Sequence, residues 1–330
     1  MRRRDFIKAL GGMAAPWPLA TAWPLAARAQ PLTKVAKVGF LYPGVASAAP
    51  TRIAALKEGI QSVGIAAEQI EVVMRQADGD PTRMPQLAKE LLDAKVDVIV
   101  AISAPATQAV RSFTTIPVIA SDLETDPVGS GLVASFAHPG GNMSGVFFDF
   151  PDFATKWIEL LKEIVPRLSS VLVMWDPTSG LVQRKAVEEA AAQSHIRLQI
   201  LEVGSLDLID DAFLRASKAG ADAVLMLSSP VFGTNPQHVA DLTLKYRLLA
   251  VTLFTEFARA GGLMAYGANL LGVFRQSGTM VGKVLLGAKP ADLPIERPSK
   301  FELVINLKTA KTLGVVIPTA VLLRADDVIE

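Results

Sequence analysis

Hydroxyl groups follow one apolar run of this 330-residue chain, where a predicted strand gives way to a predicted helix. Ser103 and Thr107 come directly after the run 96–102, with Pro105 between them in the first helical turn. Proline suits that turn, and the first N–H groups of a helix have no partner within it. Hydroxyls beside such N–H groups suit a carboxylate or a phosphate, so both residues are candidates for binding an anion. Helix capping is the alternative role.

Acidic side chains follow the next predicted strand, in the segment SDLETD at residues 121–126. With Asp122, Glu124 and Asp126 this segment is acidic, which suits an ammonium group, and Ser121, Asp122 and Asp126 are its candidate binding residues. Ligands of open α/β sheets bind outside the carboxyl ends of the strands. Other predicted strand ends therefore supply further candidates, which are Tyr42, Trp175, Asp176, Ser228, Ser229, Glu256 and Tyr266. The rings of Tyr42 and Trp175 could stack on a planar ligand, with packing in the core as the alternative.

Residue types that many enzymes and metal sites need are scarce. The chain has no Cys, which excludes disulfides, thiolate nucleophiles and cysteine-bound metals. The spacing of His138, His195 and His238 matches no metal motif, and no G-x-S-x-G nucleophile elbow occurs. Lys and Arg number 33 against 32 Asp and Glu, so no basic surplus favours nucleic acid. We expect a protein that is not an enzyme, with no metal, no cofactor and no nucleic-acid partner.

The first 29 residues predict an export signal. Four residues match the twin-arginine pattern R-R-x-F-[LI]-K, namely Arg3, Arg4, Phe6 and Lys8. An ordinary basic signal start is the alternative. An uncharged stretch follows, and a small-x-small sequence predicts cleavage between Ala29 and Gln30. Prolines and glycines in that stretch argue against a permanent anchor, and the absence of Cys excludes a lipoprotein. We expect a soluble protein in the periplasm that uses the twin-arginine export machinery.

The rest of the chain alternates apolar strand-like runs with helical patterns. Strands are predicted at 35–41, 70–74, 96–102 and 117–120, before a Gly-rich stretch at 126–145. Beyond it, strands are predicted at 171–175, 197–203, 223–227, 249–254 and 262–266. This order predicts an α/β protein with two similar, doubly wound, parallel-sheet lobes. Residues 278–283 imitate a P-loop but are one residue short, so we expect a closely packed helix there.

Three stretches carry a resemblance to a known family. They are residues 121–145 (SDLETDPVGSGLVASFAHPGGNMSG), 260–284 (AGGLMAYGANLLGVFRQSGTMVGKV) and 301–318 (FELVINLKTAKTLGVVIP). They resemble the tryptophan/tyrosine-type substrate-binding proteins of ABC transporters. The resemblance implies a type I periplasmic binding protein fold, with a ligand cleft between the lobes and crossings near Ser144, Ala268 and Pro294. Lobe 1 would hold residues 30–144 and 268–293, and lobe 2 would hold residues 145–267 and 294–330.

The same resemblance implies a receptor that binds a small molecule and delivers it to an ABC permease with its ATPase. The ligand would be an amino acid or an aromatic amino-acid-like compound. By position, Ser103 and Thr107 match the hydroxyls that hold the carboxylate, and Glu256 and Asp122 match the acid that holds the ammonium group. We expect a monomer. A periplasmic sensor for a membrane receptor and an exported enzyme are the alternatives.

Overall fold

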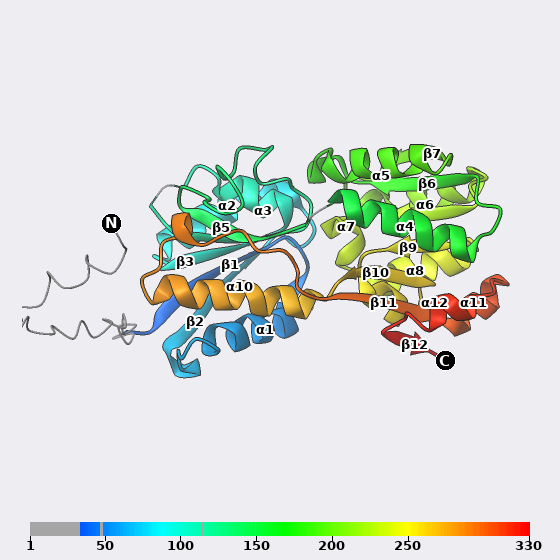
Figure 1. Cartoon of the computed structure of the whole chain (residues 1–330). Helices are drawn as coiled ribbons and strands as arrows, with labels where there is room; N and C mark the ends of the chain where they lie inside the picture. The colour runs from blue at the N-terminus through cyan, green and yellow to red at the C-terminus, as the bar shows by residue number, and fades with distance from the viewer. Residues whose placement is uncertain (1–33, 47–48, 114, 149) are drawn as a thin grey trace, which may run out of the picture. The chain divides into compact units, whose positions relative to one another are not determined.

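The apolar runs of the first part of the chain form a parallel sheet of five strands within the described residues. The computed structural model describes residues 34–46, 49–113, 115–148 and 150–330, which all belong to the unit Pro31–Glu330 (Figure 1). The strand order is β2-β1-β3-β4-β5. The strands are β1 (Ala36–Tyr42), β2 (Ile70–Gln76), β3 (Val98–Ile102), β4 (Val118–Asp122) and β5 (Met143–Phe147). Every residue of β3, β4 and β5 is buried, as expected for parallel strands covered on both faces.

Helices cover both faces of this sheet and complete lobe 1. Side chains of β3 alternate between two apolar clusters, with Val98 and Val100 in one and Ile99 in the other. The first cluster lies under α1 (Ala49–Gln61) and α10 (Leu270–Leu285), and the second under α2 (Met84–Asp93) and α3 (Ser103–Val110). Helix α10 lies along α1 in Figure 1 although the chain builds most of lobe 2 between them.

Glycines allow α1 and α10 to touch along their backbones. A Cβ atom at Gly278 would lie 2.1 Å from the Leu56 carbonyl oxygen, and one at Gly59 would lie 2.0 Å from the Arg275 carbonyl oxygen. Gly278 belongs to the segment that imitates a P-loop. The structure confirms a closely packed helix there, and that packing explains why its residues are small.

Lobe 2 is built on a seven-stranded sheet with the order β12-β11-β10-β9-β8-β6-β7. Its strands are β6 (Ser170–Trp175), β7 (Arg197–Glu202), β8 (Ala223–Met226), β9 (Ala250–Thr252), β10 (Met264–Ala268), β11 (Phe301–Asn306) and β12 (Asp327–Ile329). Its helices are α4 (Phe150–Ile164), α5 (Val182–Gln193), α6 (Ile209–Lys218), α7 (Pro230–Gly233), α8 (Pro236–Lys245), α9 (Thr255–Arg259), α11 (Leu307–Leu313) and α12 (Thr319–Leu322). All neighbouring strands are parallel except β10 and β11. That pair is antiparallel because the chain leaves lobe 2 after β10 and returns to it in β11.

The lobe limits differ slightly from those expected. Strand β5 stays in the lobe 1 sheet through Phe147, whereas the expected limit lay at 144. Glu296 pairs with the same strand, because its N–H donates to the Gly145 carbonyl oxygen at 2.9 Å and its own carbonyl accepts from the Phe147 N–H at 3.0 Å. The third crossing therefore leaves lobe 1 after residue 296, two residues beyond Pro294.

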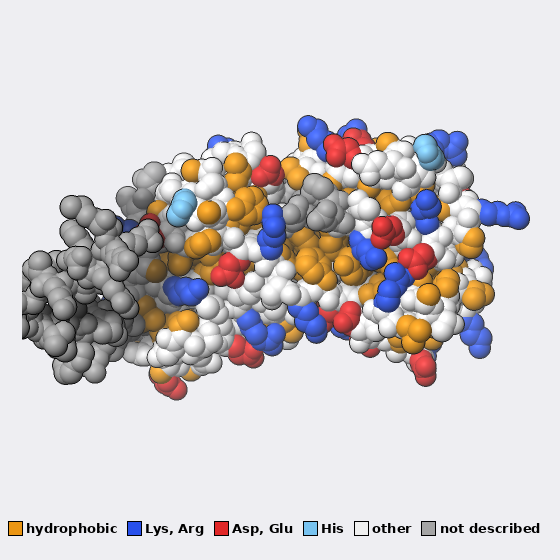
Figure 2. All heavy atoms as spheres, viewed as in Figure 1, with side chains coloured by type: hydrophobic (Ala, Val, Ile, Leu, Met, Phe, Trp, Pro, Cys, Tyr) orange, Lys and Arg blue, Asp and Glu red, His pale blue; other side chains and the backbone are white. Residues whose placement is uncertain are grey.

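Aromatic rings pack where the segments joining the lobes meet. The ring of Tyr266 stacks on Phe153 with centroids 5.1 Å apart, and Phe153 also contacts Phe148 and Phe301. Figure 2 shows apolar side chains gathered around the joining segments, with basic and acidic side chains interspersed over the rest of this face. Tyr266, expected to bind ligand, belongs to this aromatic cluster.

The export motif and the cleavage site lie outside the described residues, with all of their predicted positions: Arg3, Arg4, Phe6, Lys8, Ala29 and Gln30. Within the described ranges, none of the helices is both long and apolar enough to span a bilayer.

Candidate ligand-binding site

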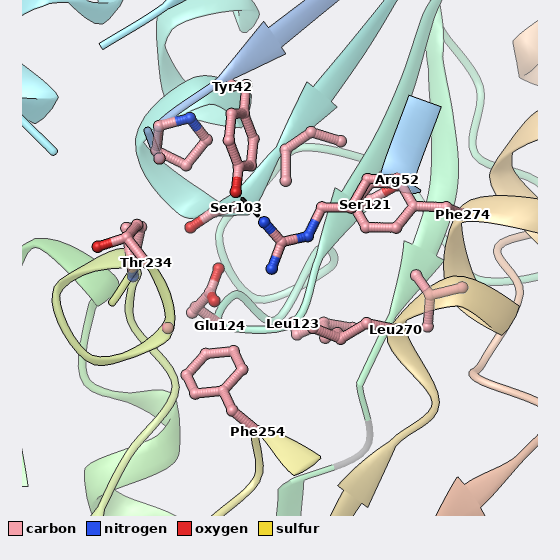
Figure 3. A pocket seen from close by; sticks show the side chains of 16 residues that line it. Tyr42, Arg52, Ser103, Ser121, Leu123, Glu124, Thr234, Phe254, Leu270 and Phe274 are labelled. Carbon is pink, nitrogen blue, oxygen red and sulfur yellow. Dashed lines mark hydrogen bonds between the residues drawn. The ribbon is translucent and has the colours of Figure 1, made fainter. Parts of the chain in front are cut away.

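A pocket lies at the carboxyl ends of β1, β3 and β4, where residues of both lobes meet (Figure 3). Lobe 1 contributes loop residues after its strands, the first turns of α10 and one residue of α1. Lobe 2 contributes both ends of the short helix α7, the residue after it and the segment after β9. The lining residues are Tyr42, Pro43, Gly44, Arg52, Ile102, Ser103, Ser121, Leu123, Glu124, Pro230, Gly233, Thr234, Phe254, Leu270, Val273 and Phe274. The space inside is about 70 Å³, which holds several waters.

Glu124 is the acidic group of this pocket, and it links the lobes. Its Oε1 accepts a hydrogen bond from the Ser228 hydroxyl of lobe 2 at 2.6 Å. Its Oε2 accepts one from the Ala104 N–H at the start of α3, at 3.0 Å. The side chain is only 4% exposed. Burial raises the pKa of Glu124 to about 8, and the negative charge of Asp122 adds to the rise.

Arg52 brings a cation into the pocket from α1. Its guanidinium donates a hydrogen bond to the Tyr42 hydroxyl and lies 5.3 Å from the centre of the Tyr42 ring. Burial raises the pKa of that hydroxyl; the charge of Arg52 opposes the rise and the charge of Glu256 adds to it. In Figure 3 the guanidinium of Arg52 and the carboxyl of Glu124 point into the same space.

Two buried hydroxyls of the pocket have no hydrogen bond of ordinary geometry among the described residues, those of Ser103 and Thr234, although Ser103 lies near enough to Glu124 to offset part of the rise that burial causes in the pKa of that carboxyl. Ser103 adopts a left-handed backbone conformation with φ of 72°, which is uncommon for a residue other than glycine. Buried polar groups nearly always have hydrogen bonds, so unpaired hydroxyls lining a cavity indicate the place of a ligand or of water. The Ser121 hydroxyl already has a partner, the Ser277 hydroxyl at 2.7 Å.

The rest of the lining is apolar. Phe254 of lobe 2 and Phe274 of α10 reach into the pocket together with Leu123 and Leu270. The position of the Phe254 ring requires glycine at residue 233, because a Cβ atom there would lie 2.8 Å from that ring. The pocket thus combines one cation, one acid and free hydroxyls with an apolar wall, as small-molecule sites commonly do.

Tyr42, Ser103 and Ser121, all expected to bind ligand, lie together in this pocket, and Thr107 does not. The Thr107 hydroxyl is fully buried and donates to the Ser103 carbonyl oxygen at 3.0 Å, one turn back in α3. The N–H of Ala104 at the helix start is occupied by Glu124 rather than open to an anion. Of the two expected anion-binding hydroxyls, Ser103 alone faces the cavity.

Asp122 and Asp126 also lie outside the pocket lining. The Asp122 Oδ1 atom accepts from the N–H groups of Glu124 and Thr125, at 2.9 and 3.1 Å, and its Oδ2 atom is buried without a partner. The Asp126 Oδ1 atom accepts from the N–H groups of Val128 and Gly129, which closes a turn. The acid of this segment that reaches the pocket is Glu124, between them.

The predicted site residues at the strand ends of lobe 2 mostly hydrogen-bond to neighbouring groups rather than facing the pocket. The Trp175 indole donates to the Gly180 carbonyl oxygen at 2.8 Å. Asp176 accepts from the Thr178 N–H at 2.8 Å and from the Ser229 hydroxyl. Ser228 contacts Glu124, and its own N–H donates to Gln183. These residues support the walls of the cleft without lining this pocket.

Glu256 lies near the pocket without lining it. Its half-buried side chain leaves Oε2 without a partner in the described part of the chain, and its charge acts on Tyr42.

Five residues that line the pocket were not predicted from the sequence as site residues: Arg52, Glu124, Thr234, Phe254 and Phe274. Glu124 stood in the acidic segment that was singled out, and Phe254 closes a predicted strand, so the strand-end rule could have found both. In the described residues no cluster of His, Asp and Glu is suited to a metal ion.

Comparison with known proteins gives consistent matches. The closely similar solved structures include an ABC domain from Streptococcus pneumoniae in complex with L-Trp, with a TM-score of 0.81 and 26% identity over 89% of this chain and 99% of that one. A conserved domain protein of Vibrio cholerae has a TM-score of 0.82 and 25% identity over 89% of this chain and 100% of that one. A tyrosine-binding protein of Clostridioides difficile is 24% identical over 252 residues, which are 74% of this chain and 71% of that protein. These matches confirm the fold that the resemblance implied. The family model described as ABC transporter substrate binding protein matches residues 47–329, so the chain belongs to that family.

Proposed function

We propose that this protein binds an amino acid with an apolar side chain, in particular an aromatic one, and delivers it to an ABC permease. The observation that carries the proposal is that Arg52 and Glu124 line one pocket beside an apolar wall. An amino acid presents a carboxylate, an ammonium group and a side chain from one carbon atom, and the pocket offers a partner for each.

The orientation of the ligand follows from the charges. The carboxylate lies between the guanidinium of Arg52 and the unpaired hydroxyl of Ser103, because hydrogen bonds to charged partners are the strong ones. The ammonium group lies at Glu124. The side chain lies against Phe254 and Phe274, where offset ring contacts favour an aromatic group. The L-Trp complex of the Streptococcus relative and the name of the Clostridioides relative support this ligand class.

A screen of amino acids by thermal shift tests this proposal. A ligand at a hundredfold excess over its Kd stabilises the folded protein by about 2.7 kcal/mol, so L-tryptophan and L-tyrosine are expected to raise the Tm. Titration calorimetry of the positive compounds would then give the affinities. Absence of any shift with all twenty amino acids would refute the proposed ligand class.

Ser103 and Thr107 provide a matched pair for mapping the carboxylate. Ser103→Ala is expected to weaken binding of L-tryptophan roughly ten- to a hundredfold, because one hydrogen bond to a charged group contributes about 1.5–3 kcal/mol. Thr107→Val is expected to keep the affinity and to lower stability by about 1 kcal/mol, since its hydroxyl bonds to the Ser103 carbonyl oxygen and acts on the Asp122 carboxyl, and it does not line the pocket. Calorimetric titration and Tm measurements on both variants check this. Equal affinity of the Ser103 variant and the wild type would move the carboxylate elsewhere in the pocket.

We also propose that the protein is exported to the periplasm by the twin-arginine machinery and acts there as a monomer. The sequence of residues 1–29 supports export, and family membership supports a role outside the cytoplasm with a permease and its ATPase as partners. Replacing Arg3 and Arg4 by Lys is expected to leave the precursor in the cytoplasm, because a general signal needs only positive charge while the twin-arginine signal needs both arginines. Cell fractionation checks this. Unchanged delivery would rule out the twin-arginine route while leaving an ordinary signal in place.

A further inference from the structure

We propose that ligand binding in this pocket expels a proton held by the buried carboxyl pair of Asp122 and Glu124, so that uptake of an amino acid is coupled to proton release. This inference rests on the proposed function, because the cationic ammonium group of the ligand is what replaces the proton. The proton leaves the carboxyl of Glu124 for the solvent, and the ammonium group takes its place beside the resulting carboxylate.

The two carboxyl groups are held together in a dry place. Asp122 is completely buried and Glu124 is 4% exposed. The N–H of Glu124 donates to the Asp122 Oδ1 atom at 2.9 Å, which ties the second acid to the first. The other Asp122 oxygen is buried without a partner among the described residues. Two neighbouring negative charges out of contact with water are costly, so the pair retains a proton when the pocket is empty.

The hydrogen bonds to this pair come from neutral donors. Glu124 accepts from the Ser228 hydroxyl and the Ala104 N–H, and Asp122 accepts from two backbone N–H groups. The hydroxyls of Ser103 and Thr107 also act on Glu124 and Asp122, respectively, and offset part of the rise that burial causes in the pKa of each carboxyl. A hydroxyl accepts as readily as it donates, so the contact with Ser228 survives protonation of Glu124 with its direction reversed. The site can thus hold Glu124 in either state while keeping the contact between the lobes.

The charged groups around the pair leave room for one more positive charge. Among the described residues that line the pocket, α1 contributes Arg52 as the one cation, and β1 contributes Tyr42, which binds it. From lobe 2, Glu256 of α9 acts on Tyr42, and Asp176 faces Ser229. Asp126 lines a hollow on the other side of Glu124. Two acids in the pair and one cation nearby favour either a bound proton or a bound ammonium group.

The titration of Glu124 agrees with this geometry. Burial and the neighbouring Asp122 raise its pKa to about 8, and burial also raises the pKa of Asp122. At neutral pH the empty protein therefore holds a proton at Glu124, and a bound ammonium group lowers the pKa of that carboxyl. Below about pH 8 the affinity for the ligand is expected to rise with pH, by at most about tenfold per pH unit for one proton, and to level off above it.

Calorimetric titration of L-tryptophan into the wild type at pH 7 tests the inference directly. The heat of binding is measured in phosphate and in Tris, whose protonation enthalpies differ, and the difference gives the number of protons released. The expected result is release of up to one proton together with affinity that rises from pH 6 to pH 8. Equal heats in both buffers and a flat pH profile would overturn the inference while leaving amino-acid binding intact.

Two variants separate the roles of the acids. Glu124→Gln keeps an acceptor for Ala104 and a partner for Ser228, so the lobe contact persists while the charge is lost. It is expected to bind L-tryptophan at least tenfold more weakly with no proton release. Asp122→Asn keeps the Oδ1 acceptor and removes the repulsion, so the pKa of Glu124 falls and less proton is released at pH 7. Proton release by the Glu124 variant equal to that of the wild type would contradict the assignment.

A ligand-free measurement keeps this inference distinct from the proposed ligand class. A carboxyl whose pKa lies near 4.5 in the unfolded chain and near 8 in the folded protein keeps its proton longer in the folded state. Between these two pKa values the Tm of the wild type is therefore expected to fall as the pH rises. The Tm of the Glu124→Gln variant is expected to fall less over the same range. Parallel Tm profiles for the two proteins would refute the bound proton, even if L-tryptophan binds. Failure of all amino acids to bind, with the expected Tm profiles, would refute coupling to an amino acid and the proposed ligand class together.

Discussion

Arg52→Met is expected to weaken the binding of L-tryptophan by about thirtyfold to a few thousandfold. Loss of one partner from a buried, hydrogen-bonded charge pair costs about 2–5 kcal/mol, and each 1.4 kcal/mol is a factor of ten in Kd. In the proposed complex the ligand carboxylate would lose its cation while its own charge stays buried. Methionine keeps the unbranched stem of the side chain, so the change removes the guanidinium with its charge, its hydrogen bond to Tyr42 and its contact with the Tyr42 ring.

Arg275→Met provides the matched control. Arg275 stands on α10 and pairs with Glu58 at 2.6 Å, with both side chains about half exposed to solvent. Exposed ion pairs contribute little to stability, and this one lies outside the pocket lining. The control is expected to bind like the wild type in calorimetric titration. If Arg52→Met also binds like the wild type, the carboxylate is held by another group.

Gly278→Ala is expected to destabilise lobe 1 by about 1–3 kcal/mol, although alanine favours a helix over glycine by about 1 kcal/mol. The added methyl group would lie 2.1 Å from the Leu56 carbonyl oxygen and 3.0 Å from the Gly59 Cα atom. Both neighbours are backbone atoms of α1, so the helices must separate along their length rather than adjust one side chain. Thermal unfolding followed by circular dichroism measures the effect as a lower Tm.

Gly141→Ala serves as the control for this change. A Cβ atom at Gly141 meets no heavy atom within 4 Å, so the same substitution adds the same methyl group in open space. Its Tm is expected to match that of the wild type. A Tm for Gly278→Ala as high as that of the control would show that α1 and α10 can move apart at little cost.

The sequence predicts the strands of both lobes well because they are buried on both faces. Val98 to Ile102, for example, is a continuous apolar run, which is typical of a central parallel strand covered on both faces. The antiparallel pairing of β11 with β10 could not be predicted in this way. It depends on the direction in which the chain re-enters lobe 2, and no periodicity within the strand Phe301–Asn306 records that direction.

The candidate site was predicted only in part, for a related reason. Strand ends led to Tyr42, Ser103 and Ser121, because topology alone brings them to one edge of the sheet. Arg52 lies inside a helix, and its direction depends on how α1 packs against the sheet and α10. Thr107 was misplaced because a hydroxyl in a helix can bond to the carbonyl four residues before it, and the structure has that bond.

The position of α10 in the chain sets an order on folding. Ser62 of the segment after α1 contacts Thr279 of α10 at 3.2 Å, although Thr279 stands 217 positions further along the chain. When the ribosome has completed the five strands of lobe 1, the sheet face that α10 covers is still bare, and it stays so until most of lobe 2 has been made. Contacts of such long range form slowly, because the ends of a long loop must first meet. Lobe 1, whose strands are synthesised first, therefore cannot finish folding until most of lobe 2 has been made, and its exposed apolar face needs protection in the meantime.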